Sequence, residues 1–331
     1  MAVDVPPTLI DSLLEIHRDL HAHPELSMQE HRTAGLVEQR LSSLGCTTHR
    51  VGDTGVVGWL ENGDGPVVAF RADMDGLPVR EETGLAWAST ATGTLPDGTT
   101  SPVMHACGHD IHITCGLGIA TYLAEHRDQW QGTVVMIFQP GEETGEGAQS
   151  MVDNRLWEIA PRPVAVFGQH VSGGRAGTAH VTPGLAMAMA DSWRVTVHGH
   201  GGHGSRPEKT LDPVLLAAHM VVRLQSVITR EVSARDLSVL TVATFHAGTK
   251  ENVIPDTAVF TVNMRHHDQS VRDHVTAAAR RVLNAEAAAS GAPEPTIEEI
   301  STFPLTINDP ELTGTVRGLL AAELGDEAVT S

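Results

Sequence analysis

Three short apolar segments, each followed at once by polar residues that can do chemistry, constrain the fold of this chain most. They span residues 67–70, 133–138 and 164–167, and stretches with helical spacing separate them. A short continuous apolar run is typical of a strand that is buried on both faces of a parallel sheet. The pattern therefore predicts an α/β fold in which the carboxyl ends of the three strands meet at one edge of a sheet.

Five side chains that could bind a ligand come just after these strands: Asp73, Asp75, Glu142, Glu143 and His170. In open α/β sheets, ligands bind outside the carboxyl ends of the strands. We therefore expect these side chains to form a single site.

The segment Cys107-Gly-His109 adds two side chains of types that bind metal ions. Residues two apart in an extended or turning segment project to the same side, so the thiolate and the imidazole would lie together. On its own, such a segment is more often a buried thiol near a hydrogen-bonded histidine. The ligand-type residues at the neighbouring strand ends reverse that expectation and indicate a site for a first-row metal.

The adjacent carboxylates of Glu142 and Glu143 suit metal-assisted hydrolysis. Neighbouring residues point in different directions, so one carboxylate can bind metal while the other acts on the attacking water. A metal lowers the pKa of its bound water towards 7, and a nearby carboxylate can then pass the proton to the leaving nitrogen. The spacing leaves open which glutamate has which role. Asp73 and Asp75 face the same way and are expected to orient ligand histidines, with capping of the next turn as the alternative.

From about residue 190 the pattern changes to strand, helix, strand, strand, helix, strand. This order predicts a ferredoxin-like α+β unit with its own small core, inserted into the α/β domain. The expected domains are the first part of a catalytic α/β domain at residues 1–185, the inserted βαββαβ domain at 186–302, and an incomplete return to the catalytic domain at 303–331.

Two features of the inserted domain could contact a bound substrate. The segment His198–Gly204 holds four glycines among seven residues, which permits close backbone approach. His203 on this loop could donate to a developing oxyanion, although a plain polar loop fits the spacing equally well. Arg265 ends an alternating strand and could clamp a carboxylate, or it could be a surface cation.

Four other histidines have plainer interpretations. His17, His21 and His23 on the first predicted helix are most simply a solvated face. His112 would start the second turn of a helix that begins near Cys107, and it is expected to support the ligands or face solvent rather than bind metal.

Composition limits the class of protein. The formal net charge of −19 argues against nucleic acid or an anionic membrane as the partner. The three cysteines cannot build a disulfide framework, which indicates a reducing compartment. The first residues lack the basic start and apolar run of a secretory signal, and no apolar stretch approaches the roughly 20 residues that span a bilayer. A cytoplasmic location is expected.

Six segments, in order along the chain, carry a resemblance to a known family: residues 17–26, 71–78, 104–110, 141–143, 201–204 and 252–255. They resemble the metal-dependent amidohydrolases of the aminoacylase/carboxypeptidase superfamily. The branch that looks most similar contains hippurate hydrolase, bacterial N-acyl-amino-acid amidohydrolases and plant auxin-conjugate hydrolases.

The resemblance implies a zinc-exopeptidase-like catalytic domain with two divalent metal ions, and an inserted domain that acts as a lid and mediates homodimerisation. The implied reaction is hydrolysis of the amide bond of a small N-acyl amino acid, of N-acetyl or N-benzoyl type, to a carboxylate and a free amino acid. The residues it implies are the metal ligands Cys107, His109, Glu143 and His170, the general base Glu142, the oxyanion donor His203, and the substrate-binding residues Asn252 and Arg265.

The end of the chain departs from the family pattern. Members of this family continue through further strands that carry one last metal-ligand histidine, whereas residues 304–331 contain no histidine. We therefore expect a C-terminally truncated chain in which one metal site is weakened.

Three alternatives stay open at this point. Thiolate, imidazole and carboxylate ligands admit zinc, manganese, cobalt or nickel. The same site could serve a dipeptidase or a carboxypeptidase, which acts on a peptide bond. A catalytically silent metal-binding or dimerising protein is the alternative from a different class.

Overall fold

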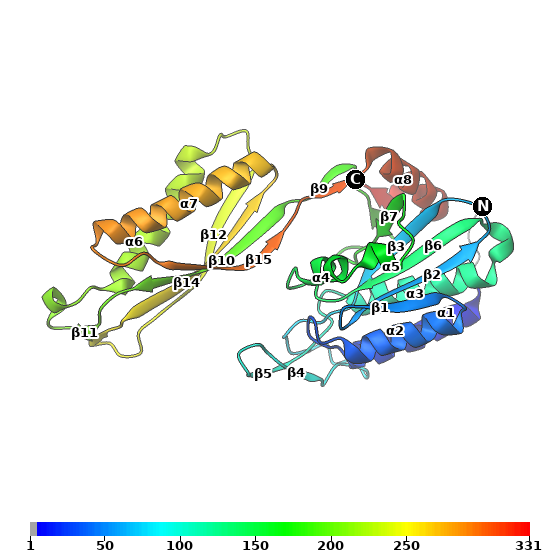
Figure 1. Ribbon diagram of the computed structural model, residues 1–331, viewed down its shortest axis with the longest axis horizontal. Helices are drawn as coiled ribbons and strands as arrows, with labels where there is room; N and C mark the ends of the chain where they lie inside the picture. Colours follow the sequence, from blue (N-terminus) through cyan, green and yellow to red (C-terminus); the bar gives the residue numbers. More distant parts are fainter. Residues whose placement is uncertain (1–4) are drawn as a thin grey trace. The chain divides into compact units, whose positions relative to one another are not determined.

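The computed structural model describes residues 5–331, and the chain divides into two compact units after Arg175 (Figure 1). Unit 1 runs to Arg175, and unit 2 comprises Ala176–Ser331. The predicted boundaries at residues 185 and 302 stay predictions.

Unit 1 is built on a five-stranded sheet with the order β1-β2-β6-β3-β7. Its strands are β1 (Thr47–Val51), β2 (Gly55–Asn62), β3 (Val67–Asp73), β6 (Gly132–Gln139) and β7 (Ala165–Gly168). β3 pairs in parallel with both β6 and β7, while β1 and β2 are antiparallel. The three apolar segments are thus the parallel strands expected of them, and their carboxyl ends lie at one edge of the sheet.

Helices cover both faces of this sheet. On one face, α1 (Pro7–Ala22), α2 (His31–Ser43) and α3 (His109–Glu125) enclose a core that includes Leu20, Leu41, Leu117, Met136 and Phe138. On the other, α4 (Gly147–Asp153) and α5 (Leu156–Ile159) pack over Val57, Val135 and Ile137. Successive residues of β6 belong to opposite cores because side chains alternate across a strand. The remaining pair of strands in unit 1 is β4 (Thr92–Thr94) and β5 (Thr100–Pro102).

Unit 2 contains a four-stranded antiparallel sheet of order β12-β14-β10-β15. Along the chain its elements are β10 (Met189–His198), α6 (Pro213–Ser226), β12 (Ser238–Ala247), β14 (Thr257–His266), α7 (Gln269–Ala289) and β15 (Thr296–Phe303). This is the βαββαβ order that the sequence predicts. Both helices pack with the sheet around one core, which includes Trp193, Met220, Phe260 and Leu283. Asp212 and Asp268 cap the two helices by accepting from backbone N–H groups of the first turn.

Shorter elements complete unit 2. They are β8 (Ala179–His180) with β17 (Val329–Thr330), β9 (Gly184–Met187) with β16 (Thr306–Asn308), β11 (Gly202–His203) with β13 (Val253–Ile254), and helix α8 (Pro310–Leu324). Within residues 5–331, no helix is long and apolar enough to cross a bilayer.

Candidate metal centre and active site

A tight turn before α3 brings Cys107 and His109 to the edge where β3 and β6 end. Gly108 adopts a left-handed conformation with φ of +76°, which a residue with a side chain rarely takes. A Cβ atom at Gly108 would also lie 2.3 Å from Cγ2 of Val171. The turn therefore requires glycine, and the helix begins at His109 rather than at Cys107.

The residues at this edge form three overlapping groups of possible ligands, which all include His109, and one of them joins His109 with His112 and His170. The other two bring in the thiol and the carboxylates. One ligand atom from each of Cys107, His109 and Glu143 lies within 4.8 Å of the others, and the same holds for Asp73, His109 and Glu142. His109 Nε2 lies 3.9 Å from Glu142 Oε2 and 3.9 Å from Glu143 Oε1. The predicted convergence of these side chains is present in the structure.

Two atoms of this cluster are buried without a hydrogen-bond partner, His109 Nε2 and Glu143 Oε1. A buried polar group left unpaired costs about 1–3 kcal/mol. A divalent cation between the two atoms would pair both. The thiol, imidazole and carboxylate donors are the set that zinc and its neighbours accept. The residues present therefore fit a divalent metal.

Asp75 holds His109 and Glu143 in place. Its Oδ1 lies 3.2 Å from His109 Nδ1, and its Oδ2 accepts from the Glu143 N–H at 3.0 Å and from the Ser27 hydroxyl at 2.6 Å. Burial alone would lower the pKa of His109, but the hydrogen bond to Asp75 and the surrounding carboxylates raise it to about 8. The contact with Asp75 fixes Nδ1 and leaves Nε2 facing the other ligands.

Asp73 anchors the segment that carries His170, acting through His112. The His112 Nδ1 lies 2.5 Å from Asp73 Oδ1, and its Nε2 accepts from the Val171 N–H at 2.9 Å. His112 is fully buried, so the expectation that it faces solvent is wrong, while its expected supporting position agrees with these contacts. The His170 ring lies 5.9 Å from that of His109, centroid to centroid.

The charges of the cluster shift two pKa values upwards. Burial and the charges of Glu143 and Asp73 raise the pKa of Glu142. Burial, a hydrogen bond to Glu143 and the neighbouring carboxylates raise the pKa of the Cys107 thiol to about 12. Burial is the largest cause of both pKa shifts, and the neighbouring carboxylates add to it; a cation would offset the contribution of these charges.

Unit 2 holds the other predicted site residues. His203 pairs with Val253 between β11 and β13, and the Gly204 N–H donates to the Asn252 carbonyl at 2.8 Å, so His203 and Asn252 lie close together. Arg265 is exposed near the far end of β14, roughly 26 Å of strand away from Thr257 at its start. Within unit 2, the structure brings His203 and Asn252 together but not Arg265.

Residues 69–331 match the family described as Peptidase family M20/M25/M40. The chain belongs to this family. It is 35% identical over 318 residues to thermostable carboxypeptidase 1 of Saccharolobus solfataricus, covering 94% of this chain and 78% of that one. It is also 35% identical to an N-acetyl-L-cysteine deacetylase of Bacillus subtilis, covering 94% and 72% of the two chains.

A solved structure of the M20 family is also similar. The Bacillus subtilis YXEP protein, described as a dinuclear metal-binding peptidase, superposes with a TM-score of 0.73 at 30% identity, covering 96% of this chain and 81% of that one. The resemblance to metal-dependent amidohydrolases and the expected α/β fold are thereby confirmed. The chain is an M20 hydrolase.

Glu30 supports the M20 site and was missed by the sequence reasoning. It is fully buried, and its carboxylate accepts from the Gly141 N–H at 2.8 Å, the Thr54 hydroxyl at 2.7 Å and the Met28 N–H at 2.9 Å. It therefore ties down the loop that carries Glu142. A charged residue just before a predicted helix gives no sign of a partner 111 positions away.

The expectation that the first-helix histidines form a solvated face is wrong for two of them. The side chains of His17 and His21 are only 25% and 12% exposed, and both contact Asp110. His23 is exposed, with its Nδ1 bonded to the carbonyl of Asp19.

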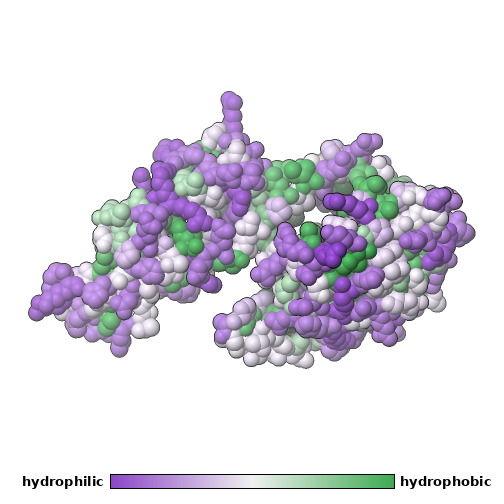
Figure 2. All heavy atoms as spheres, viewed as in Figure 1, coloured by the Kyte–Doolittle hydropathy of each residue, from purple (hydrophilic) through white to green (hydrophobic). Residues whose placement is uncertain are grey.

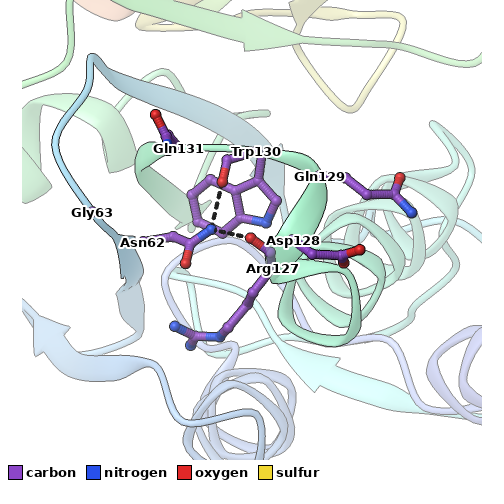
Figure 3. Close-up of a pocket in the computed structure, with 7 residues that line it drawn as sticks. All are labelled: Asn62, Gly63, Arg127, Asp128, Gln129, Trp130 and Gln131. Atoms are coloured by element: carbon purple, nitrogen blue, oxygen red, sulfur yellow. Dashed lines mark hydrogen bonds between the residues drawn. The ribbon is translucent and has the colours of Figure 1, made fainter.

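A pocket of about 600 Å³ lies away from these residues (Figure 3). The Asn62 side chain donates to the carbonyls of Arg127 and Trp130 at its wall. None of its lining residues belongs to the candidate centre; they are Asn62, Gly63, Arg127, Asp128, Gln129, Trp130 and Gln131.

Proposed function

We propose that this M20 hydrolase cleaves the amide bond of small N-acyl amino acids, releasing a carboxylate and a free amino acid. The observation that carries the proposal is the convergence of Cys107, His109 and Glu143, with His109 Nε2 and Glu143 Oε1 buried and unpaired. The relative named a deacetylase supports the substrate class.

Four residues would hold two divalent metal ions of the zinc, manganese, cobalt or nickel type: Cys107, His109, Glu143 and His170. When bound, such ions polarise a carbonyl and make water acidic enough to be deprotonated near neutral pH. Asp75 keeps the His109 ring oriented, and His112 holds the backbone next to His170.

Glu142 would be the general base. Burial and neighbouring carboxylates raise its pKa, which brings a carboxyl group closer to the pH at which it can both take and give a proton. Its carboxylate would accept the proton of the attacking water and deliver it to the departing nitrogen. His203 as oxyanion donor, and Asn252 and Arg265 as substrate-binding residues, are proposed on the resemblance alone.

Replacing Glu142 with Gln tests this assignment. Turnover should fall by about 10²–10⁴-fold, the usual contribution of a general base, while metal content stays unchanged. Glu146→Gln is the matched control, because Glu146 lies exposed in the same loop. Hydrolysis of N-acetyl amino acids and elemental analysis measure the two effects. Retained turnover in Glu142→Gln would show that another group is the base.

A dipeptidase or carboxypeptidase is the second candidate. It would use the same residues on a peptide bond, and the relative named a carboxypeptidase favours it. Turnover of N-acetyl, N-benzoyl and dipeptide substrates, measured side by side, discriminates between the candidates. Bound metal without turnover on any of them would favour the catalytically silent protein instead.

We also propose that unit 2 mediates homodimerisation through β12. This strand lies at an edge of the four-stranded sheet and exposes Val239 and Phe245 by 55% and 40%. Polar side chains dominate the face seen in Figure 2, with apolar ones in patches among them. An unpaired apolar edge strand is a template for pairing with a second copy. The molar mass from light scattering tests this proposal; a monomer at micromolar concentration would contradict it.

A further inference from the structure

A second cluster of ligand-type side chains lies in unit 1 and shares no residue with the proposed metal centre. His17 and His21 lie one turn apart on α1, and Asp110 lies in the first turn of α3. One ligand atom from each of the three lies within 4.8 Å of the others.

Both imidazoles converge on one carboxylate oxygen. His17 Nε2 lies 3.2 Å from Asp110 Oδ2, and His21 Nδ1 lies 2.6 Å from the same atom. In a tetrahedral zinc site, ligand atoms lie about 3.3 Å from one another, because each is about 2.0–2.1 Å from the metal. The His17–Asp110 separation is thus close to that of a zinc site, and an outward movement of the His21 ring would bring its Nδ1 to a similar distance from Asp110 Oδ2.

The second ring nitrogen of His21 contacts a carboxylate, as the second nitrogen of a metal-binding histidine often does. Its second nitrogen, Nε2, lies 3.0 Å from Glu81 Oε1, and Glu81 is itself held by the Thr83 hydroxyl and the Ser89 N–H. Metal-binding histidines commonly donate their other N–H to a carboxylate, which fixes the tautomer. Here that arrangement would leave Nδ1 as the nitrogen that faces Asp110.

His105 provides an independent observation at the same place. Its side chain is 96% shielded from solvent, and neither ring nitrogen has a hydrogen-bond partner. His105 lies in the turn before α3, where its carbonyl accepts from the Gly108 N–H. A buried imidazole with both nitrogens unpaired is costly, so the turn that leads to Asp110 holds an unsatisfied nitrogen ligand.

We propose that His17, His21 and Asp110 form a binding site for a divalent transition-metal ion, separate from the Cys107 centre. Two imidazoles and a carboxylate suit zinc, cobalt or nickel, and two histidines at positions i and i+4 of a helix are a common half of such a site. The His17 side chain is 25% exposed, whereas that of Asp110 is 2% exposed, so the ion would enter from the α1 side. Bound there, it would tie α1 to the start of α3.

The competing account is a hydrogen-bonded contact without metal, in which His21 carries a proton on both ring nitrogens and donates from Nδ1 to Asp110 and from Nε2 to Glu81. Zinc binding distinguishes the two accounts. Metal-stripped protein is dialysed against buffered free Zn²⁺, and zinc per chain is measured by elemental analysis. The wild type should hold one zinc more per chain than His17→Ala. His23→Ala, just past the end of the same helix and outside the cluster, should match the wild type.

A Cys107→Ser background separates this site from the other centre. Adding His17→Ala to Cys107→Ser should lower the zinc content by one equivalent per chain. Equal zinc content in Cys107→Ser and Cys107→Ser/His17→Ala would overturn the proposal. Circular dichroism checks that each variant is folded, and His17→Gln, which keeps a polar side chain, replaces His17→Ala if the latter is not.

Discussion

At the residue scale, the two nitrogens of His109 have different surroundings. Nδ1 is held by Asp75, and Nε2 is buried without a partner between Glu142 and Glu143. The sequence indicates that Asp75, Glu142 and Glu143 belong to a site, because each comes just after a predicted strand. It cannot indicate Glu30 or Ser27, because their contacts join positions that only the tertiary fold brings together.

Replacing His112 with Ala should weaken metal binding about 10- to 100-fold, the usual cost of losing a partner that orients a ligand. The change removes the bonds to Asp73 and to the Val171 N–H, which hold the segment next to His170. Metal titration of the stripped protein measures the effect. His126→Ala is the control, because His126 lies just beyond the other end of α3. Unchanged affinity in His112→Ala would refute this supporting role.

The buried carboxyl of Glu30 should make stability depend on pH. Burial raises its pKa in the folded protein above the unfolded value, despite hydrogen bonds from Thr54 and Gly141 that lower it. The folded state therefore binds more protons, and this group lowers the free energy of unfolding as pH rises above about 4.5. Between pH 4.5 and 7, the free energy of unfolding should fall less in Glu30→Gln than in the wild type. Urea unfolding across this range measures it; parallel curves would contradict the assignment.

At the scale of elements, local pattern predicts the buried strands and the helices but not all partners. β3 and β6 are continuous apolar runs because both faces of the sheet are covered. β1 and β2 were not predicted. In β2, Gly55 and Gly58 interrupt the apolar pattern, although Val56 and Val57 are buried in the cores on the two faces of the sheet. The βαββαβ order of unit 2 was predictable because each element alternates or repeats within its own length.

The turn before α3 should not tolerate a side chain. In Gly108→Ala, the positive φ and the clash with Val171 should together lower the free energy of unfolding by about 2–4 kcal/mol. Gly84→Ala is the matched control, because Gly84 has a φ of +73° but no atom within 4 Å of its Cβ position, so only the backbone cost remains. Adding Val171→Ala should recover part of the loss. Equal losses at Gly108 and Gly84 would show that the clash is relieved elsewhere.

At the scale of the whole molecule, the residues proposed for metal binding and those proposed for substrate binding belong to different units. All four proposed metal ligands and Glu142 belong to unit 1, whereas His203, Asn252 and Arg265 belong to unit 2. Local sequence pattern predicts many elements of each unit, but the point of division after Arg175 depends on contacts between distant residues. Metal binding should therefore be separable from turnover by substitution.

The most direct test of the central claim measures metal content and turnover in one preparation. The purified protein is assayed on N-acetyl and N-benzoyl amino acids before chelation, after chelation, and after return of zinc, manganese, cobalt or nickel, with elemental analysis at each step. We predict that chelation removes metal and turnover together and that one of these ions restores both. Full turnover after complete removal of metal, or metal-loaded protein that hydrolyses no N-acyl amino acid, would contradict the account.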